Sequence, residues 1–266
     1  MNDLLLAEIK SEQNELLQTF LLVEEFVFGK KATVQRELDE LVDYCQAETD
    51  EVAEPIERAE VLINALFVDQ LFIDESQQNW PVSSHQLSSA LAHKLISPIL
   101  KAVLIAHVAN ACDCQTDIVF VPEKAMLRII CDDNYAIIFD PVTGESLNWH
   151  ELDVRMNEIS GDPFEITLDI MKQESLVLEH ITSLKTAFIR EQAYDSALKC
   201  VDMLLALNPN DPFERRDRGF LLHQLDCFKV AYDDYQYFVE QCPKDPAAQL
   251  LKLQLDKISI ADTILH

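Results

Sequence analysis

The segment PILKAVLIAHV, residues 98–108, decides the fold that this sequence predicts. Proline at its start suits the first turn of a helix, where the backbone amide has no intrahelical partner in any case. The apolar residues that follow cover most of the circumference of a helix: Ile99, Val103, Leu104, Ile105 and Val108. A helix that is apolar on nearly all sides is a buried one. The segment therefore predicts the central helix of a globular core.

Short apolar runs follow this helix and have the length of β-strands. Three strands are expected, at residues 118–121, 126–130 and 135–139. The second and third are joined by Cys131-Asp132-Asp133-Asn134, whose composition favours a hairpin turn. We expect a small antiparallel sheet packed on the helix that begins at Pro98.

The residues before the buried helix are expected to be mainly helical. Apolar side chains recur at spacings of three and four in residues 3–28 and 33–47, and Pro55 opens a third helix. Residues 74–84 are rich in turn-forming residues and hold Trp80, so they predict a loop with one aromatic anchor.

The chain as a whole predicts three parts. Residues 1–70 form an N-terminal helical region, residues 71–160 a mixed core and residues 174–266 a second helical region. Helices should dominate, because only 4 glycines occur among 266 residues and few backbone positions can rely on glycine conformations. The expected class is α+β and mostly helical.

The C-terminal region contains an internal repeat. The sequence NPNDP at residues 208–212 reappears as QCPKDP at residues 241–246, with equivalent prolines 34 residues apart. This spacing is the period of a tetratricopeptide repeat, which is a pair of antiparallel helices. The register places small residues where paired helices must approach closely, at Ala197, Gly219 and Ala231. It also predicts a capping helix over residues 246–258. Each Asp-Pro pair supplies a capping side chain and a first-turn proline, which is how a helix begins.

Composition limits the classes of partner and the compartment. The formal charge of −26 repels a phosphate backbone, so direct nucleic-acid binding is not expected, although a basic partner segment suits it. An acidic surface of this kind is common in soluble bacterial proteins. The 7 cysteines lie mostly within apolar patterns, and their odd number together with this placement indicates reduced thiols. With no signal-like N-terminus and no apolar run of about 18 residues, we expect a cytoplasmic protein without membrane contact.

Four motifs, in their order along the chain, resemble one known family. They are LISPIL at residues 95–100, VPEKAMLR at 121–128, FDPVTG at 139–144 and FVEQCP at 238–243. Together with the helical start, they resemble the SirB-one family, whose members join a transglutaminase-like core to C-terminal tetratricopeptide repeats. The resemblance covers almost the whole chain and implies that residues 71–160 form such a core.

The resemblance also implies where catalytic groups would lie. A core of this type needs a thiolate at the start of the buried helix, a histidine base from the sheet and a carboxylate that orients the histidine. The matching positions here are Leu100, with Ser97 as the nearest hydroxyl, Lys124 and Asp140. Leucine cannot attack, and a lysine with a pKa of about 10 is a poor base at neutral pH. We therefore expect a degenerate site in which Asp140 caps its own turn and pairs with Lys124.

Two classes of function stay open. The first is a non-catalytic interaction or regulatory protein, which binds another protein or peptide through the repeat face or through the cleft where the catalytic groups of relatives would lie. The binding candidates are Trp80, Arg215, Arg216 and Arg218, with Lys199 beside them and Trp149 as a second aromatic. The alternative is a cysteine-dependent amide hydrolase or transferase that uses Cys112, Cys114 or Cys131. No cofactor or metal is expected, because Cys112 and Cys114 have the wrong spacing for a zinc site.

Overall fold

The chain forms two compact units in the computed structural model, which describes residues 3–11, 15–30, 33–72, 74, 79–121, 124–147, 152, 154, 168–253 and 255. One unit is Glu8–His180, and the other is Met1–Ala7 with Ile181–His266. The helices between residues 16 and 70 and the sheet lie in the same unit, whereas most of the first helix, Asp3–Lys10, falls in the other. The expected division at residues 70, 160 and 174 stays a prediction.

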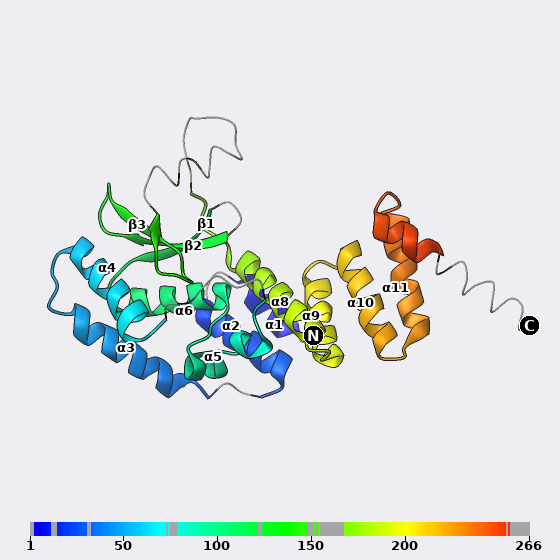
Figure 1. Ribbon diagram of the computed structural model, residues 1–266, viewed down its shortest axis with the longest axis horizontal. Coiled ribbons are helices and arrows are strands. Elements are labelled where there is room, and N and C mark those ends of the chain that lie inside the picture. Colours follow the sequence, from blue (N-terminus) through cyan, green and yellow to red (C-terminus); the bar gives the residue numbers. More distant parts are fainter. Residues whose placement is uncertain are drawn as a thin grey trace, which may run out of the picture. The chain divides into compact units, whose positions relative to one another are not determined.

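Helices make up most of the first unit (Figure 1). Their bounds are α1 (Asp3–Lys10), α2 (Leu16–Phe28), α3 (Gln35–Thr49), α4 (Pro55–Asn64), the π-helical turn η1 (Ala65–Asp69), the 3-10 turn η2 (Val82–His85), α5 (Leu87–His93) and α6 (Pro98–Ala111). The single helix expected over residues 3–28 is therefore two helices, α1 and α2. Within the described residues no single helix has both the length and the apolar character needed to cross a membrane, and α5 and α6 meet that test only together, with an 84° bend between them.

Helix α6 is the central helix, as its sequence predicts. It packs on strands β1 (Thr116–Val121) and β2 (Lys124–Ile130) and also contacts α2 and α3. The side chains of Val103, Leu104, Ile105 and Val108 are at most 1% exposed. Burial on every side is the reason that this helix tolerates an apolar residue at almost every position.

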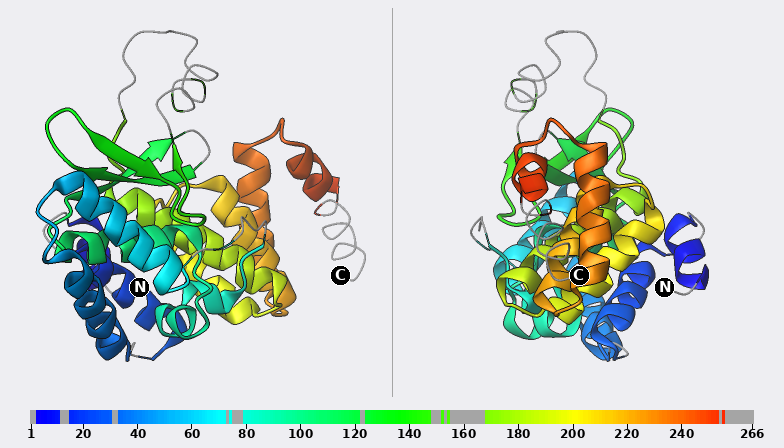
Figure 2. Two further views of the ribbon diagram at one scale, coloured as in Figure 1. Left: turned by 60° about the vertical axis from the view of Figure 1, so that its left-hand side comes forward. Right: turned by 90° about the vertical axis from the view of Figure 1, so that its right-hand side faces the viewer.

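The sheet has four antiparallel strands in the order β1-β2-β3-β4, with β3 (Ala136–Phe139) and β4 (Ser146–Leu147) after the first two. It covers one side of the helices of its unit (Figures 1 and 2). The sequence predicts about three strands and misses β4. Two residues are too few to show the alternation that marks a strand, and β4 is defined only by its pairing with Ile138 and Phe139.

The second unit is built from antiparallel helices, and it confirms the repeat. Helices α8 (Gln173–Arg190), α9 (Tyr194–Leu207), α10 (Pro212–Gln224) and α11 (Phe228–Gln241) follow one another, and residues 246–253 are helical again. Asp211 Oδ1 accepts hydrogen bonds from the amides of Phe213 at 2.8 Å and Glu214 at 3.2 Å. Asp245 Oδ1 likewise accepts from the Ala247 amide at 2.7 Å. Both Asp-Pro pairs therefore begin helices as predicted, and the end of the expected capping helix, at residues 256–258, lies outside the described residues.

Small side chains let α10 and α11 approach each other closely. A Cβ atom placed on Gly219 would lie 2.8 Å from Tyr235 Cδ1 and 3.2 Å from the carbonyl oxygen of Ala231. Ala231 is 1% exposed, and Ala197 on α9 is fully buried. The predicted register of the repeat is confirmed at these three positions.

Replacing Ala231 with leucine should therefore lower the free energy of unfolding by about 1–3 kcal/mol, because extra methylene groups have no room between the helices. Denaturant titration measures the change. The matched control is Val230→Leu on the same helix, where the side chain is 50% exposed and a change within about 0.5 kcal/mol is expected. Equal stability of the two variants would contradict the close approach of α10 and α11.

Candidate functional site

Asp140 lies where strand β3 ends and organises the turn that follows it. Its side-chain Oδ1 accepts a hydrogen bond from the Val142 amide at 2.7 Å. Its backbone carbonyl accepts from the Gly144 amide, and its own amide donates to the Glu145 carbonyl, both at 2.9 Å. Gly144 has a φ of +75°, and a Cβ atom there would lie 2.7 Å from the Phe67 ring, so the turn needs glycine at this position.

Lys124, the first residue of β2, forms the ion pair that the sequence predicts. Its Nζ atom lies 2.5 Å from Asp140 Oδ2. The lysine side chain is 45% exposed, whereas the aspartate side chain is only 11% exposed. The carboxylate that would orient a histidine in an active core is instead bonded to an ammonium group and to a backbone amide.

The start of α6 presents no nucleophile. Leu100 is 2% exposed and fills the core at the position where the thiolate of an active relative is expected. Ser97, the nearest hydroxyl, is also 2% exposed, and its Oγ atom is buried without a hydrogen-bond partner among the described residues. A hydroxyl in this state has no described base beside it that could take its proton.

A buried lysine next to this position is missing from the sequence-based prediction. Lys101 is fully buried, and its Nζ atom donates a hydrogen bond to the Val142 carbonyl at 3.2 Å. Burial lowers the pKa of Lys101 to about 8, although the charges of Asp74 and Asp140 act in the opposite direction. The signal was present in the sequence, as the one charged residue within PILKAVLIAHV.

The three cysteines of the alternative enzymatic reading are not activated in the structure. Cys112 and Cys114 are 5% and 4% exposed, and both follow the C-terminus of α6. Burial raises the pKa of Cys112 and of Cys131, and raises that of Cys114 to about 11. The C-terminal end of a helix is its negative end, which also disfavours a thiolate. Within the described residues, no group of three or more His, Cys, Asp or Glu side chains could hold a metal ion.

Two histidines of the first unit are buried together. The rings of His85 and His180 have centroids 5.7 Å apart, and both residues are at most 2% exposed. Burial, with a smaller contribution from His85, lowers the pKa of His180 to about 3. His180 is therefore uncharged at neutral pH, which suits a packing role.

The binding candidates have structural partners of their own. Trp80 is 8% exposed and belongs to the core of its unit, and Trp149 lies outside the described residues. Arg218 forms a bidentate pair with Asp234 of α11, at 2.7 Å for both bonds, and Arg215 lies 3.3 Å from the same carboxylate. Arg216 bonds to its neighbour Asp217. Recognition of a partner by these residues stays a prediction.

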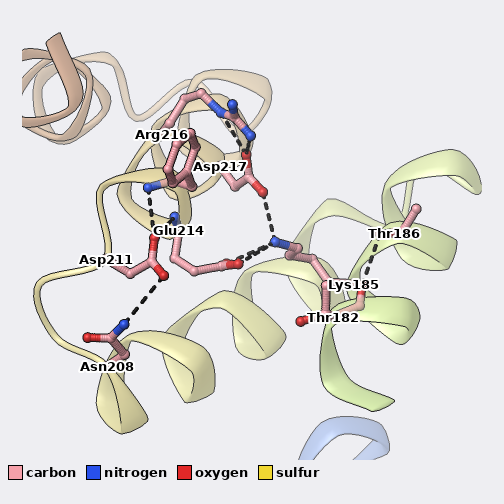
Figure 3. A network of polar contacts seen from close by, with 9 residues as sticks. Thr182, Lys185, Thr186, Asn208, Asp211, Glu214, Arg216 and Asp217 are labelled. Carbon is pink, nitrogen blue, oxygen red and sulfur yellow. Dashed lines mark hydrogen bonds and ion pairs between the residues drawn. The ribbon is translucent and has the colours of Figure 1, made fainter. Parts of the chain in front are cut away.

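A further buried lysine links two helices of the second unit (Figure 3). Lys185 of α8 is 4% exposed, and its Nζ atom lies 2.7 Å from Glu214 Oε1 and 2.7 Å from Asp217 Oδ2 on α10. Burial by itself would lower the pKa of Lys185, but the hydrogen bonds and charges of Asp217 and Glu214 raise it overall. The ammonium group therefore stays charged in the interior. Helical periodicity gave no sign of this network, because its members come from two helices about 30 residues apart in sequence.

Comparison with known proteins adds the family. A model of the transglutaminase-like superfamily matches residues 32–180, and a tetratricopeptide-repeat model matches residues 184–256. The chain is 31% identical to protein SirB1 of Salmonella typhimurium over 237 residues, which is 88% of each chain. The chain belongs to the SirB1 family. The UPF0162 protein YchA of Escherichia coli K12 is 33% identical, with the same coverage of both chains.

Membership of the SirB1 family confirms the resemblance that the motifs indicated, with a transglutaminase-like core followed by tetratricopeptide repeats. Among solved structures, a crystal structure of menin matches 89% of this chain and 68% of its own, with 10% identity and a TM-score of 0.37. A likeness this weak carries no argument about the SirB1 family.

Proposed function

We propose that this protein is a non-catalytic interaction or regulatory protein, in which a transglutaminase-like core has lost its catalytic groups. Two observations support the proposal: Asp140 is bonded to Lys124 at 2.5 Å, and Leu100 is buried at the position where the resemblance places the nucleophile. An acyl transfer of this type needs a nucleophile within hydrogen-bond reach of its base. The aligned positions supply neither group.

The proposed role is to bind another protein or a peptide. Tetratricopeptide repeats generally mediate contacts between proteins, and a repeat model matches residues 184–256. The formal charge of −26 favours a basic partner over a nucleic acid. All seven cysteines are free thiols, which suits a reducing compartment, so the proposal places the protein in the cytoplasm.

The competing function is a cysteine-dependent amide hydrolase or transferase. That chemistry requires a thiolate at neutral pH, and the thiols of Cys112, Cys114 and Cys131 all have raised pKa values. Their surroundings therefore support the non-catalytic proposal.

An activity assay tests the proposal. We expect the purified protein to release no more ammonia from glutamine and peptide amides than buffer does, and to form no crosslinked product with an amine donor. A transglutaminase, which releases ammonia from glutamine side chains and joins them to amines, serves as the positive control. We also expect Cys112, Cys114 and Cys131 to react with iodoacetamide no faster than a free thiol at pH 6, since burial raises the pKa of each. Turnover that disappears in a single Cys→Ala variant with an intact fold would establish the enzymatic alternative instead.

A further inference from the structure

An open groove of about 720 Å³ lies on the first unit, between α4 with η1 on one side and the β3–β4 hairpin on the other. The helical wall includes Glu60, Ile63 and Val68, and the strand wall includes Tyr135, Ile137 and Glu145. The strand wall continues through Thr143 and Gly144, in the turn that Asp140 organises. The turn that follows Asp140 therefore forms part of the strand wall of the groove.

Apolar side chains on opposite walls are exposed to solvent. Val68 is 57% exposed on the helical wall, and Tyr135 is 44% exposed on the strand wall. The π-helical turn η1 accounts for the first of these, because it packs Phe67 edge-on against Phe139 and leaves the next residue, Val68, outside. Single exposed apolar residues are ordinary, but two that line one groove form a surface that a partner could cover. Turns of π-helix also occur often at functional sites.

The floor of the groove follows an edge strand. Of the described residues, only Ser146 and Leu147 pair with the outer side of β3, opposite Phe139 and Ile138. Ala136 and Ile137 continue β3 beyond that pairing and line the groove. An edge of this kind offers backbone amides and carbonyls to a chain in extended conformation.

The charges around the groove are acidic. Glu60 and Glu145 are both exposed, and no lysine or arginine is among the described lining residues. A peptide that brings basic side chains to these two carboxylates would be favoured over a neutral or acidic one.

We propose that this groove binds an extended segment of a partner protein in which apolar residues alternate with lysine or arginine. Alternation places the apolar side chains toward Val68 on the helical wall and the basic side chains toward Glu145 on the strand wall, since neighbouring side chains of a strand point to opposite sides. The inference rests on the proposed interaction function and adds the site and the chemistry of the partner.

Peptide binding to the full chain tests the site. The probe is a fluorescein-labelled peptide of alternating lysine and valine, titrated at physiological salt and followed by fluorescence anisotropy. Two comparison peptides replace either lysine with glutamate or valine with serine. The charge-reversed groove variant is Glu60→Lys with Glu145→Lys, and the matched control is Asp233→Lys with Glu240→Lys, which changes the net charge equally at exposed positions of the second unit.

We expect the lysine–valine peptide to bind at least about tenfold more tightly than either comparison peptide. The groove variant should weaken binding by about tenfold or more, and the control by less than about twofold. Val68→Ser should also weaken binding, with no change in net charge. Hydrogen exchange of the wild-type protein should slow at the amide of Ala136, which faces away from β2, when the peptide is added, a readout that needs no variant.

Several results would overturn the proposal. Equal weakening by the two charge variants would mean that the peptide senses only net charge. Slow exchange at Ala136 in the free protein would mean that the chain covers its own strand edge. Self-association in sedimentation velocity that Val68→Ser abolishes would assign the groove to a second copy. Amide turnover would instead contradict the non-catalytic function and leave the peptide result standing, so the two failures are distinguishable.

Discussion

The Asp140→Ala protein should be less stable than the wild type by about 2–4 kcal/mol, with no change in amide turnover. Loss of the hydrogen bond to the Val142 amide resembles the loss of a helix cap, which costs about 1 kcal/mol. Loss of the pair with Lys124 adds at most about 1 kcal/mol, because that lysine is 45% exposed. A further part comes from Lys101, a fully buried cation that loses one of the two carboxylates, Asp74 and Asp140, whose charges favour its protonated form. Denaturant titration at pH 7 measures the total.

A matched variant separates the two lysines. Lys124→Met keeps both the turn and the charge of Asp140 beside Lys101, so it should cost no more than about 1 kcal/mol. Combining Asp140→Ala with Lys101→Met should recover part of the lost stability, because the buried cation leaves together with the carboxylate. If Lys124→Met and Asp140→Ala cost the same, Lys101 does not depend on Asp140.

The pH dependence of stability is a second test of the effect of burying the charge of Lys101. The pKa of Lys101 is about 8 in the folded chain, whereas the pKa of an unperturbed lysine side chain is 10.5. Between these values the unfolded state binds more protons, so this group stabilises the fold increasingly as pH rises, by up to about 1.4 kcal/mol per pH unit. The buried thiols, whose pKa values are raised, act in the opposite direction. The difference between wild type and Lys101→Met cancels the thiols and should show the rise.

The Lys185→Met protein should lose about 2–4 kcal/mol of stability, because the carboxylate of Glu214 is left without its cation beside that of Asp217, which keeps only Arg216. The side chains of Glu214 and Asp217 are 14% and 22% exposed, so water reaches them only in part. Methionine has a similar length and no charge, which keeps the volume between α8 and α10 filled. Thermal or denaturant unfolding measures the loss.

Two further variants show how much of the stability loss in Lys185→Met comes from the buried charges. Lys229→Met, at an exposed position on α11, should change stability by less than about 0.5 kcal/mol. Adding Glu214→Gln to Lys185→Met should restore part of the loss, since Asp217 keeps its pair with Arg216 and no carboxylate is then without a cation. A Lys185→Met protein as stable as Lys229→Met would show that the buried network contributes nothing to the second unit.

The sequence by itself determined the features whose signals are local or periodic. The apolar circumference of residues 98–108 placed a buried helix, and the repeat of 34 residues placed the antiparallel helical pairs. Asp211 was read correctly as a cap, and Asp140 as a turn residue paired with Lys124. The helix, the repeat and the caps depend on side-chain spacing along one element or on a short turn, whereas the pairing of Asp140 with Lys124 was implied by the family resemblance.

Only the tertiary structure decided which charges are buried and what neutralises them. Lys101 meets the Val142 carbonyl 41 residues away, and Lys185 meets Glu214 at a separation of 29 residues. Strand β4 likewise exists only through its pairing with β3. The cost of burying a charge depends on every group that surrounds it in space, and chain folding sets those neighbours. Local spacing carries no record of these neighbours: the sequence shows one lysine within PILKAVLIAHV, but only the folded chain shows which groups surround Lys101 and Lys185.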